Sequence, residues 1–127
     1  MAKIATYNKY NETEPFNVGD LVSLVPETSL VTRSCTKHYK HQDMLVLGIC
    51  KSISDKSVEV INGGMVDVNV TGLICVGDKL TTSNVAGKAR AIKYANDDTR
   101  VFDIRSIGKV VGLYNDYSIA KVLLDIE

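Results

Sequence analysis

Apolar residues along this chain alternate with polar ones, or run together, in short segments separated by Gly, Asn and Asp. No segment keeps the helical spacing of apolar positions over several turns, so helix is expected to be nearly absent. We therefore predict an all-β chain. The expected strands cover residues 20–25, 44–51, 57–61, 65–70, 79–82, 88–94, 107–114 and 118–125.

Tight-turn residues lie between these strands. Asn62-Gly63-Gly64 separates two β-rich runs at hairpin spacing, Val76-Gly77-Asp78 precedes a strand, and Asn115-Asp116 stands between the last two. Short strands at this spacing fit a small antiparallel β-barrel or sandwich, with no room for the crossover helices of a parallel sheet. We divide the chain into an N-terminal arm, residues 1–16, and a β-barrel domain, residues 17–127. Residues 94–105 form either a helical turn or an exposed loop.

A short internal echo suggests a duplicated domain. Val18-Gly19-Asp20-Leu21 recurs as Val76-Gly77-Asp78-Lys79-Leu80, and each copy is followed by an apolar strand containing Gly, 46–50 and 110–114. A Gly-Asp pair permits a tight turn that a carboxylate can cap, and a Gly inside a strand suits a bulge or a sharp corner. A barrel of two similar halves and a chance echo both remain open.

Composition and charge exclude several classes of function. Fifteen basic residues balance fifteen acidic ones, whereas a protein that follows a phosphate backbone normally carries a basic excess. No apolar run is long enough to cross a bilayer, and residues 1–10 lack the apolar stretch of a secretory signal. We therefore expect synthesis in a cytosol and no nucleic-acid or membrane partner. The three cysteines, two of them (Cys50 and Cys75) in apolar strand-like runs, are expected to be buried, reduced thiols.

Candidate catalytic and metal-binding groups are sparse. His38 and His41 are the only histidines and have a spacing that could share a metal ion, but a third ligand is absent nearby apart from Asp43 and Cys35. An exposed polar connector between two strands is the favoured interpretation of this segment. The glycines lack the context of a phosphate-binding loop. We predict no enzyme activity, no catalytic residue, no cofactor and no metal site.

Carboxylates are also scattered along the chain. Asp97, Asp98 and Asp103 could supply an acid and a base for hydrolysis, but nothing in their spacing specifies such a pair. Solvated loop charge is the favoured interpretation.

Three aromatic residues stand out in and beside the polar arm. Tyr7, Tyr10 and Phe16 lie where an isolated barrel core would not need them, and Tyr is enriched at protein interfaces. The arm either docks on a partner through these residues or packs back on its own domain.

The run 76–89, preceded by 67–72 and followed by Ile107-Gly108-Lys109-Val110-Val111-Gly112, resembles small β-barrel modules of tailed-phage virions. Such modules combine a Gly-Asp turn, a strand ending in small polar residues, a Gly turn and a returning Ile-Gly-x-Val strand. The resemblance covers residues 18–124 and is closest to capsid decoration, or cement, proteins. Similar barrels occur in phage tail-spike, fibre and baseplate proteins, where they are usually part of a longer chain.

The resemblance implies a protein that binds between subunits of the major capsid protein and stabilises the assembled shell by mass action. It implies a location in the virion after assembly in the bacterial cytoplasm, and a homo-oligomer, with a trimer expected from those modules. One alternative is a tail component, such as a baseplate, collar or fibre barrel. Another is a small-ligand or sugar-binding module, which the absence of Trp disfavours.

Overall fold

The protein folds into two antiparallel sheets of five strands each, seen in a computed structural model that describes residues 2–36, 45–92 and 106–126. No helix occurs in these ranges, so the all-β prediction is confirmed, in the form of a sandwich-like pair of sheets that are not closed into barrels. The first sheet has the order β1-β5-β4-β2-β3 and the second β6-β10-β9-β7-β8. The strands are β1 (Ile4–Asn8), β2 (Leu21–Leu24), β3 (Val31–Arg33), β4 (Val46–Ile53), β5 (Ser57–Ile61), β6 (Gly63–Asn69), β7 (Lys79–Thr82), β8 (Ala89–Ala91), β9 (Gly108–Leu113) and β10 (Ile119–Asp125).

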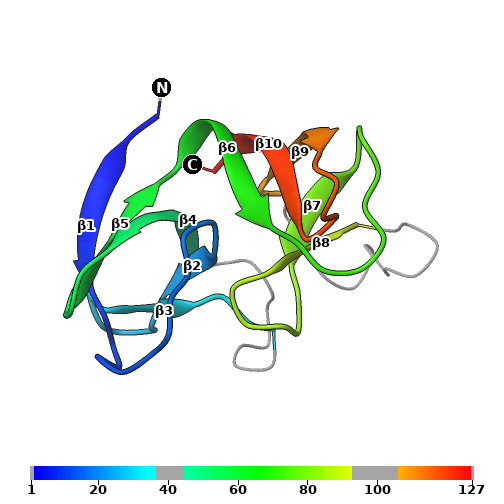
Figure 1. Cartoon of the computed structure of the whole chain (residues 1–127). Coiled ribbons are helices and arrows are strands. Elements are labelled where there is room, and N and C mark those ends of the chain that lie inside the picture. The colour runs from blue at the N-terminus through cyan, green and yellow to red at the C-terminus, as the bar shows by residue number, and fades with distance from the viewer. Residues whose placement is uncertain (1, 37–44, 93–105, 127) are drawn as a thin grey trace.

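Each sheet is built from one continuous stretch of chain, a first half (residues 4–61) and a second half (residues 63–125), which lie side by side in Figure 1. The two strand orders are the same when each strand of the first half is matched to the strand five places later. The fold is therefore a duplicated five-stranded unit.

The Gly-Asp turn repeats in atomic detail. Gly19 and Gly77 have φ values of 96° and 95°, in the left-handed region that favours glycine. The Asp20 carboxylate accepts a hydrogen bond from the Asn17 N–H at 2.8 Å, as Asp78 does from the Cys75 N–H at 2.9 Å. The echo that the sequence suggested thus reflects a structural repeat.

The glycine-containing apolar strand of each half, β4 or β9, also repeats. The sequence echo aligned these two strands in the wrong register. Gly48 pairs with Val22 as Gly108 pairs with Leu80, so Gly48 corresponds to Gly108 and not to Gly112. A bulge follows in both strands, at the shift between Cys50 and Ser52 and at the matching shift beside Val110. The glycine of the Ile-Gly pair at residues 107–108 is thus the first residue of β9 and the counterpart of Gly48.

The predicted arm is part of the first sheet. Residues 4–8 form β1, which pairs antiparallel with β5, from Ile4 opposite Ile61 to Asn8 opposite Ser57. β6 holds the same place in the second half, where it pairs with β10. In its described part, residues 2–16, the predicted arm therefore does not stand apart from the domain. Of the two alternatives, it packs on the chain's own domain.

The turn predicted at Asn62-Gly63-Gly64 is not a hairpin. β5 and β6 belong to different sheets, and Asn62 forms the link between the halves, where its N–H donates to the Lys3 carbonyl oxygen. Alternating apolar and polar residues on both sides of a glycine pair are expected for a hairpin, but they are equally compatible with a connection between two sheets. The turn at Asn115-Asp116 is confirmed, because β9 and β10 pair as neighbours.

Buried apolar side chains form two clusters. The smaller cluster fills the first half and includes Phe16, Val22 and Val60. The larger cluster fills the second half and also takes in Leu21 and Ile49, which are the buried members that the first half contributes. These two side chains therefore join the cores of the two halves.

Candidate interaction surfaces

The halves meet at a junction made by unlike segments. From the first half come residues 18–21 and 34–36, and from the second half come Asn69 and the loop 83–87. The Leu21 N–H donates to the Gly87 carbonyl oxygen at 2.8 Å, and the Gly87 N–H donates to the Ser34 carbonyl oxygen at 2.8 Å. A contact between unlike surfaces is heterologous, or head-to-tail.

Asp20 is the polar centre of this junction. Its Oδ1 accepts a hydrogen bond from Asn69 Nδ2 at 2.9 Å, and the same amide donates to the Val18 carbonyl oxygen at 3.1 Å. A Cβ on Gly87 would lie 2.7 Å from the Asp20 carboxyl carbon, so this close approach requires glycine. Burial raises the pKa of Asp20 above its usual value, although hydrogen bonds from Asn69 and Asn17 oppose the shift. This carboxylate serves the fold, since its partners belong to the chain itself.

The three aromatic residues proposed for docking have separate environments. Phe16 is 6% exposed and belongs to the first-half core, with the Lys9 ammonium 6.0 Å from its ring centre. Tyr7 is half-buried and packs against the same core. Tyr10 is exposed and is the one of the three that a partner could reach without rearrangement. The structure does not bring them together as one docking surface.

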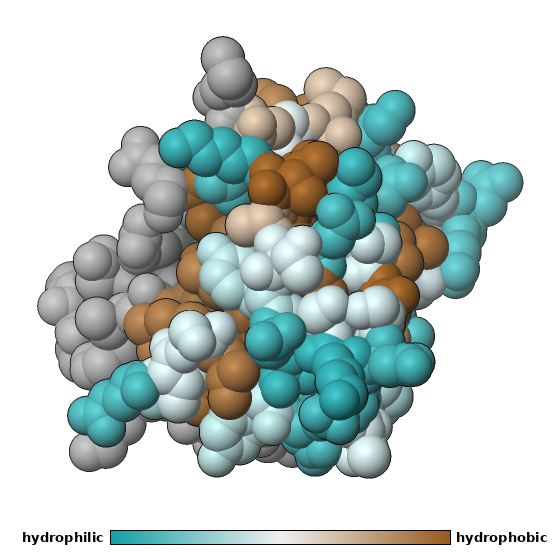
Figure 2. Space-filling model, turned by 90° about the vertical axis from the view of Figure 1, so that its left-hand side faces the viewer, coloured by the Kyte–Doolittle hydropathy of each residue, from teal (hydrophilic) through white to brown (hydrophobic). Residues whose placement is uncertain are grey.

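The outer side of the first half does not carry a continuous apolar face. Figure 2 views the molecule from this side, where hydrophilic side chains cover most of the surface and hydrophobic ones show in separate groups. Scattered apolar residues of this kind are normal for a protein surface.

A loop of the second half presents apolar side chains that sequence reasoning missed. In residues 71–76, Leu73 is 78% exposed and Val76 is 62% exposed, on either side of the buried Ile74. Cys75 is exposed in the same loop, so its prediction as a buried thiol is wrong, whereas Cys35 and Cys50 are buried. The apolar run 73–76 is strand-like in sequence, although the turn glycines Gly72 and Gly77, both at positive φ, bracket a loop.

The loop 71–76 can be compared with the equivalent segment of the first half. Its counterpart in the first half is the segment before Gly19, where Phe16 takes the buried place of Ile74 and Pro15 stands where the second half has Leu73. Both halves therefore need one buried apolar anchor before the Gly-Asp turn. The exposed leucine is a feature of the second half alone and serves no packing purpose in it.

Tyrosines mark a second exposed site, the turn between β9 and β10. Tyr114 Oη donates a hydrogen bond of 2.6 Å to Asp67 Oδ1, which raises the pKa of Tyr114, and Tyr117 is exposed at a φ of 58°. The bond to Asp67 holds one ring in place at the surface. An ordered tyrosine with an exposed ring suits a protein contact.

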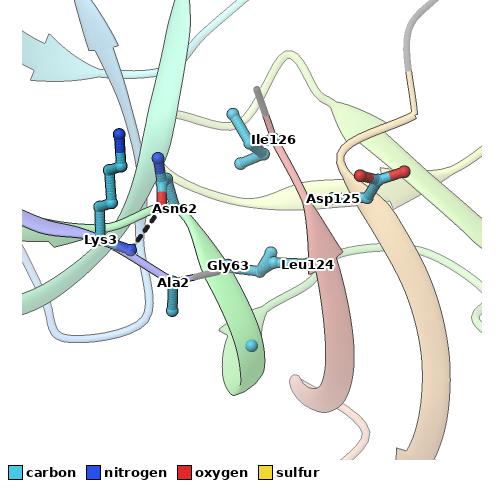
Figure 3. A pocket seen from close by; sticks show the side chains of 8 residues that line it. Ala2, Lys3, Asn62, Gly63, Leu124, Asp125 and Ile126 are labelled. Carbon is cyan, nitrogen blue, oxygen red and sulfur yellow. Dashed lines mark hydrogen bonds between the residues drawn. The ribbon is translucent and has the colours of Figure 1, made fainter.

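A shallow cavity of about 520 Å³ lies where the start of the chain meets the Asn62 link and the end of β10 (Figure 3). Two of its lining residues are hydrogen-bonded to each other, since the Lys3 N–H donates to Asn62 Oδ1 at 2.8 Å. Its lining consists of Ala2, Lys3, Asn62, Gly63, Gly64, Leu124, Asp125 and Ile126. No aromatic side chain lines it, so it offers no ring on which a sugar could stack.

The described residues hold no group of three His, Cys, Asp or Glu side chains that could bind a metal ion. His38, His41, Asp43, Asp97, Asp98 and Asp103 lie outside the described residues, as does the whole segment 94–105. Within the described ranges, no helix is long and apolar enough to span a membrane. Comparison with known proteins finds no matching family model, no similar curated protein and no similar solved structure.

Proposed function

We propose that this chain is a structural protein of a tailed-phage virion, which decorates the assembled capsid and stabilises it by binding between capsid subunits. The loop 71–76 is the observation that carries the proposal, because two aliphatic side chains are exposed there with no role in the fold. The sequence resemblance of residues 76–89 supports the same class of protein. The all-β architecture agrees with it.

The loop would act by burying Leu73 and Val76 against a capsid subunit. Full burial of one such side chain contributes about 1.5–3 kcal/mol, which corresponds to roughly a tenfold to hundredfold gain in affinity. A partner that binds only the assembled shell shifts the equilibrium away from free subunits. The ordered Tyr114 ring would add contact area at the neighbouring hairpin. A role as a non-enzymatic structural component follows from this mechanism.

The proposal is tested by co-sedimentation of the protein with purified capsids and, separately, with purified tails. We expect binding to capsids, and a loss of more than about tenfold in affinity for the double variant Leu73→Ser/Val76→Ser. Val18→Ser is the matched control, since Val18 precedes Gly19 as Val76 precedes Gly77 and is similarly exposed. Binding only to tails would move the protein to a baseplate, collar or fibre, and binding to neither would refute a virion role.

A further inference from the structure

The two described sheets have four edge strands, and three of these edges are protected against further pairing. β3 and β8 have three residues each and are bridged to Lys9 and Val70 of the same chain. β6 carries the charged Asp67 and a left-handed Gly64 with a φ of 83°. Short length, charge and irregular backbone are devices by which native proteins discourage the addition of a strand.

The fourth edge strand, β1, has none of these devices apart from its modest length. Its five residues include no charge and no proline, four of them are exposed, and its pairing with β5 runs without a bulge. A regular, uncovered edge presents unpaired backbone groups to any extended chain. The edge of β1 is therefore where the described sheets invite an additional strand.

The register shows which backbone groups of β1 face outward. Bonds to the neighbouring chain begin at Lys3, whose carbonyl oxygen accepts from the Asn62 N–H at 3.1 Å, and end at Lys9, whose N–H donates to the β4–β5 turn at 2.8 Å. Hydrogen bonds alternate along an antiparallel pair, so the even-numbered residues between them point their backbone groups away from β5. Within the described residues, no hydrogen-bond partner exists for these outward groups, which are the N–H and C=O of Ile4 and Thr6 and the N–H of Asn8.

The second half shows what such an edge accepts. Asn69 is the counterpart of Asn8, since both lie opposite the first residue of the strand with which they pair. The Asn69 N–H donates to the Gly19 carbonyl oxygen at 3.0 Å, which belongs to a segment outside its own sheet. The matching N–H of Asn8 is thus oriented to donate to the backbone of another segment.

The side chains beside this edge favour an aliphatic residue in the added strand. Ile4 is 48% exposed and lies opposite Ile61, which packs against the larger core cluster, so an apolar row reaches the edge. The cavity of about 520 Å³ lies at the start of β1, with Leu124 and Ile126 in its lining (Figure 3). A strand added to β1 would bury Ile4 and pass beside this cavity, where an aliphatic side chain removes apolar surface from water.

The position of β1 fits a protein that joins two subunits. Figure 1 shows β1 at one end of the molecule and the chain between β6 and β7, which includes the loop 71–76, at the other. Binding between subunits requires two separate contacts, and a protein that holds both gains affinity because the second contact forms at a high effective concentration. The loop 71–76 supplies one contact, and the opposite end of the molecule is left for the other.

We propose that an extended segment of a second capsid subunit pairs with β1 and becomes a sixth strand of the first sheet, with an aliphatic side chain packed beside Ile4. This second contact rests on the proposed function, since it names where another capsid subunit binds. Backbone hydrogen bonds to the outward groups of Ile4, Thr6 and Asn8 supply affinity, and the side chain beside Ile4 supplies selectivity.

Thr6→Pro tests the pairing, because proline removes an outward N–H but no hydrogen bond to β5, and edge strands tolerate proline at such positions. We expect this variant to lose more than about tenfold in affinity for purified capsids in co-sedimentation. Thr6→Val is the matched control, since it keeps the N–H and the β-branched shape, and it should bind like the wild type. Met65→Pro makes the same change at the edge of β6, at the counterpart of Ile4, and should also bind like the wild type. Circular dichroism verifies the fold of each variant.

Amide hydrogen exchange gives a second measurement that needs no variant. The outward amides of Ile4, Thr6 and Asn8 should exchange rapidly in the free protein and more than about tenfold more slowly in the complex with capsids. The outward amide of Met65 on β6 should exchange at the same rate in both. Protection of β6 in place of β1 would overturn the proposal.

The outcomes separate this contact from the proposed function. Full capsid binding by a folded Thr6→Pro, or β1 amides that stay unprotected in the complex, would overturn the pairing with β1, whereas a defect of Leu73→Ser/Val76→Ser in the same assay would leave the decoration role standing. Protection of β1 in the isolated protein as its concentration rises would identify a second copy as the occupant and also overturn the pairing with a capsid segment. A wild type that does not bind capsids refutes both.

Discussion

Substitution of Gly48 or Gly108 by alanine tests the duplicated strand geometry directly. Neither glycine has a positive φ, so alanine would adopt the backbone without strain. The obstacle is space: a Cβ on Gly48 would lie 2.2 Å from the Ile61 carbonyl oxygen, and one on Gly108 would lie 2.5 Å from the Leu123 carbonyl oxygen. These oxygens belong to backbone within a paired strand, which cannot turn aside as a flexible side chain can.

The expected magnitude follows from opposing contributions. Alanine in a strand interior normally gains about 0.5–1 kcal/mol over glycine. Overpacking a well-packed interior costs about 1–3 kcal/mol, and lengthened ladder hydrogen bonds cost about 0.5–1.5 kcal/mol each. We expect Gly48→Ala to lose about 2–3 kcal/mol of unfolding free energy. Gly108→Ala should lose somewhat less, because its contact is less close.

Gly112→Ala is the matched control, on the same strand as Gly108. Its Cβ would meet the Lys121 Cβ at 3.6 Å, an ordinary van der Waals contact, so stability should be unchanged or slightly higher. Urea unfolding followed by circular dichroism measures all three variants, with an unchanged slope taken as evidence that the same two states are compared. Equal losses at Gly112 and Gly48, or none at Gly48, would show that the close approach is not what requires glycine.

Three further predictions concern buried groups. Thr81→Val should leave the unfolding free energy unchanged or raise it by about 1 kcal/mol, because the Thr81 hydroxyl is buried without a hydrogen-bond partner. Ser23→Ala, at the matched position of the first half, should lower it by about 1 kcal/mol, because the Ser23 hydroxyl is hydrogen-bonded to the Ser34 hydroxyl. Urea unfolding of both variants compares them, and a clear loss in Thr81→Val would contradict this account. Burial raises the pKa of Asp20 above that of an aspartate in the unfolded chain, so the folded state binds this proton more tightly. The unfolding free energy of the wild type relative to Asp20→Asn should therefore increase as pH falls from 7 into the acidic range where the carboxyl is protonated; a difference independent of pH would count against this account. Cys75 should react with a thiol reagent at pH 8 in the folded protein while Cys50, whose pKa burial raises to about 11, reacts only on unfolding; equal rates would argue against the buried position of Cys50.

Strand positions followed from the sequence where the apolar pattern was strong. The expected strands 57–61 and 79–82 coincide with β5 and β7, since alternating or β-branched runs there are bounded by turn residues. β1 and β3 were missed. β1 lies in a polar context and owes its conformation to pairing with β5, while β3 has only three residues, too few for a period to show.

Surface features were less accessible than strands. Tyr7 and Phe16 were noted as unusual, but their places in the first-half core depend on pairing between β1 and β5, which a local pattern does not contain. The exposure of Leu73 was missed because an apolar run suggests a buried strand whether or not a sheet receives it. Its signal was the pair of glycines that bracket the run.

Comparison of the two halves separates what the fold requires from what it does not. The Gly-Asp turn, the strand glycine and the bulge occur in both halves, because each satisfies a local backbone demand that arises twice. The two halves diverge at Leu21 against Lys79, although β2 and β7, the strands that carry these residues, are paired alike. A lysine in place of a leucine cannot be explained by the fold of the half, which is the same in both. The difference must lie in what each side chain contacts: Leu21 is covered by the second half, and Lys79 meets solvent or another molecule.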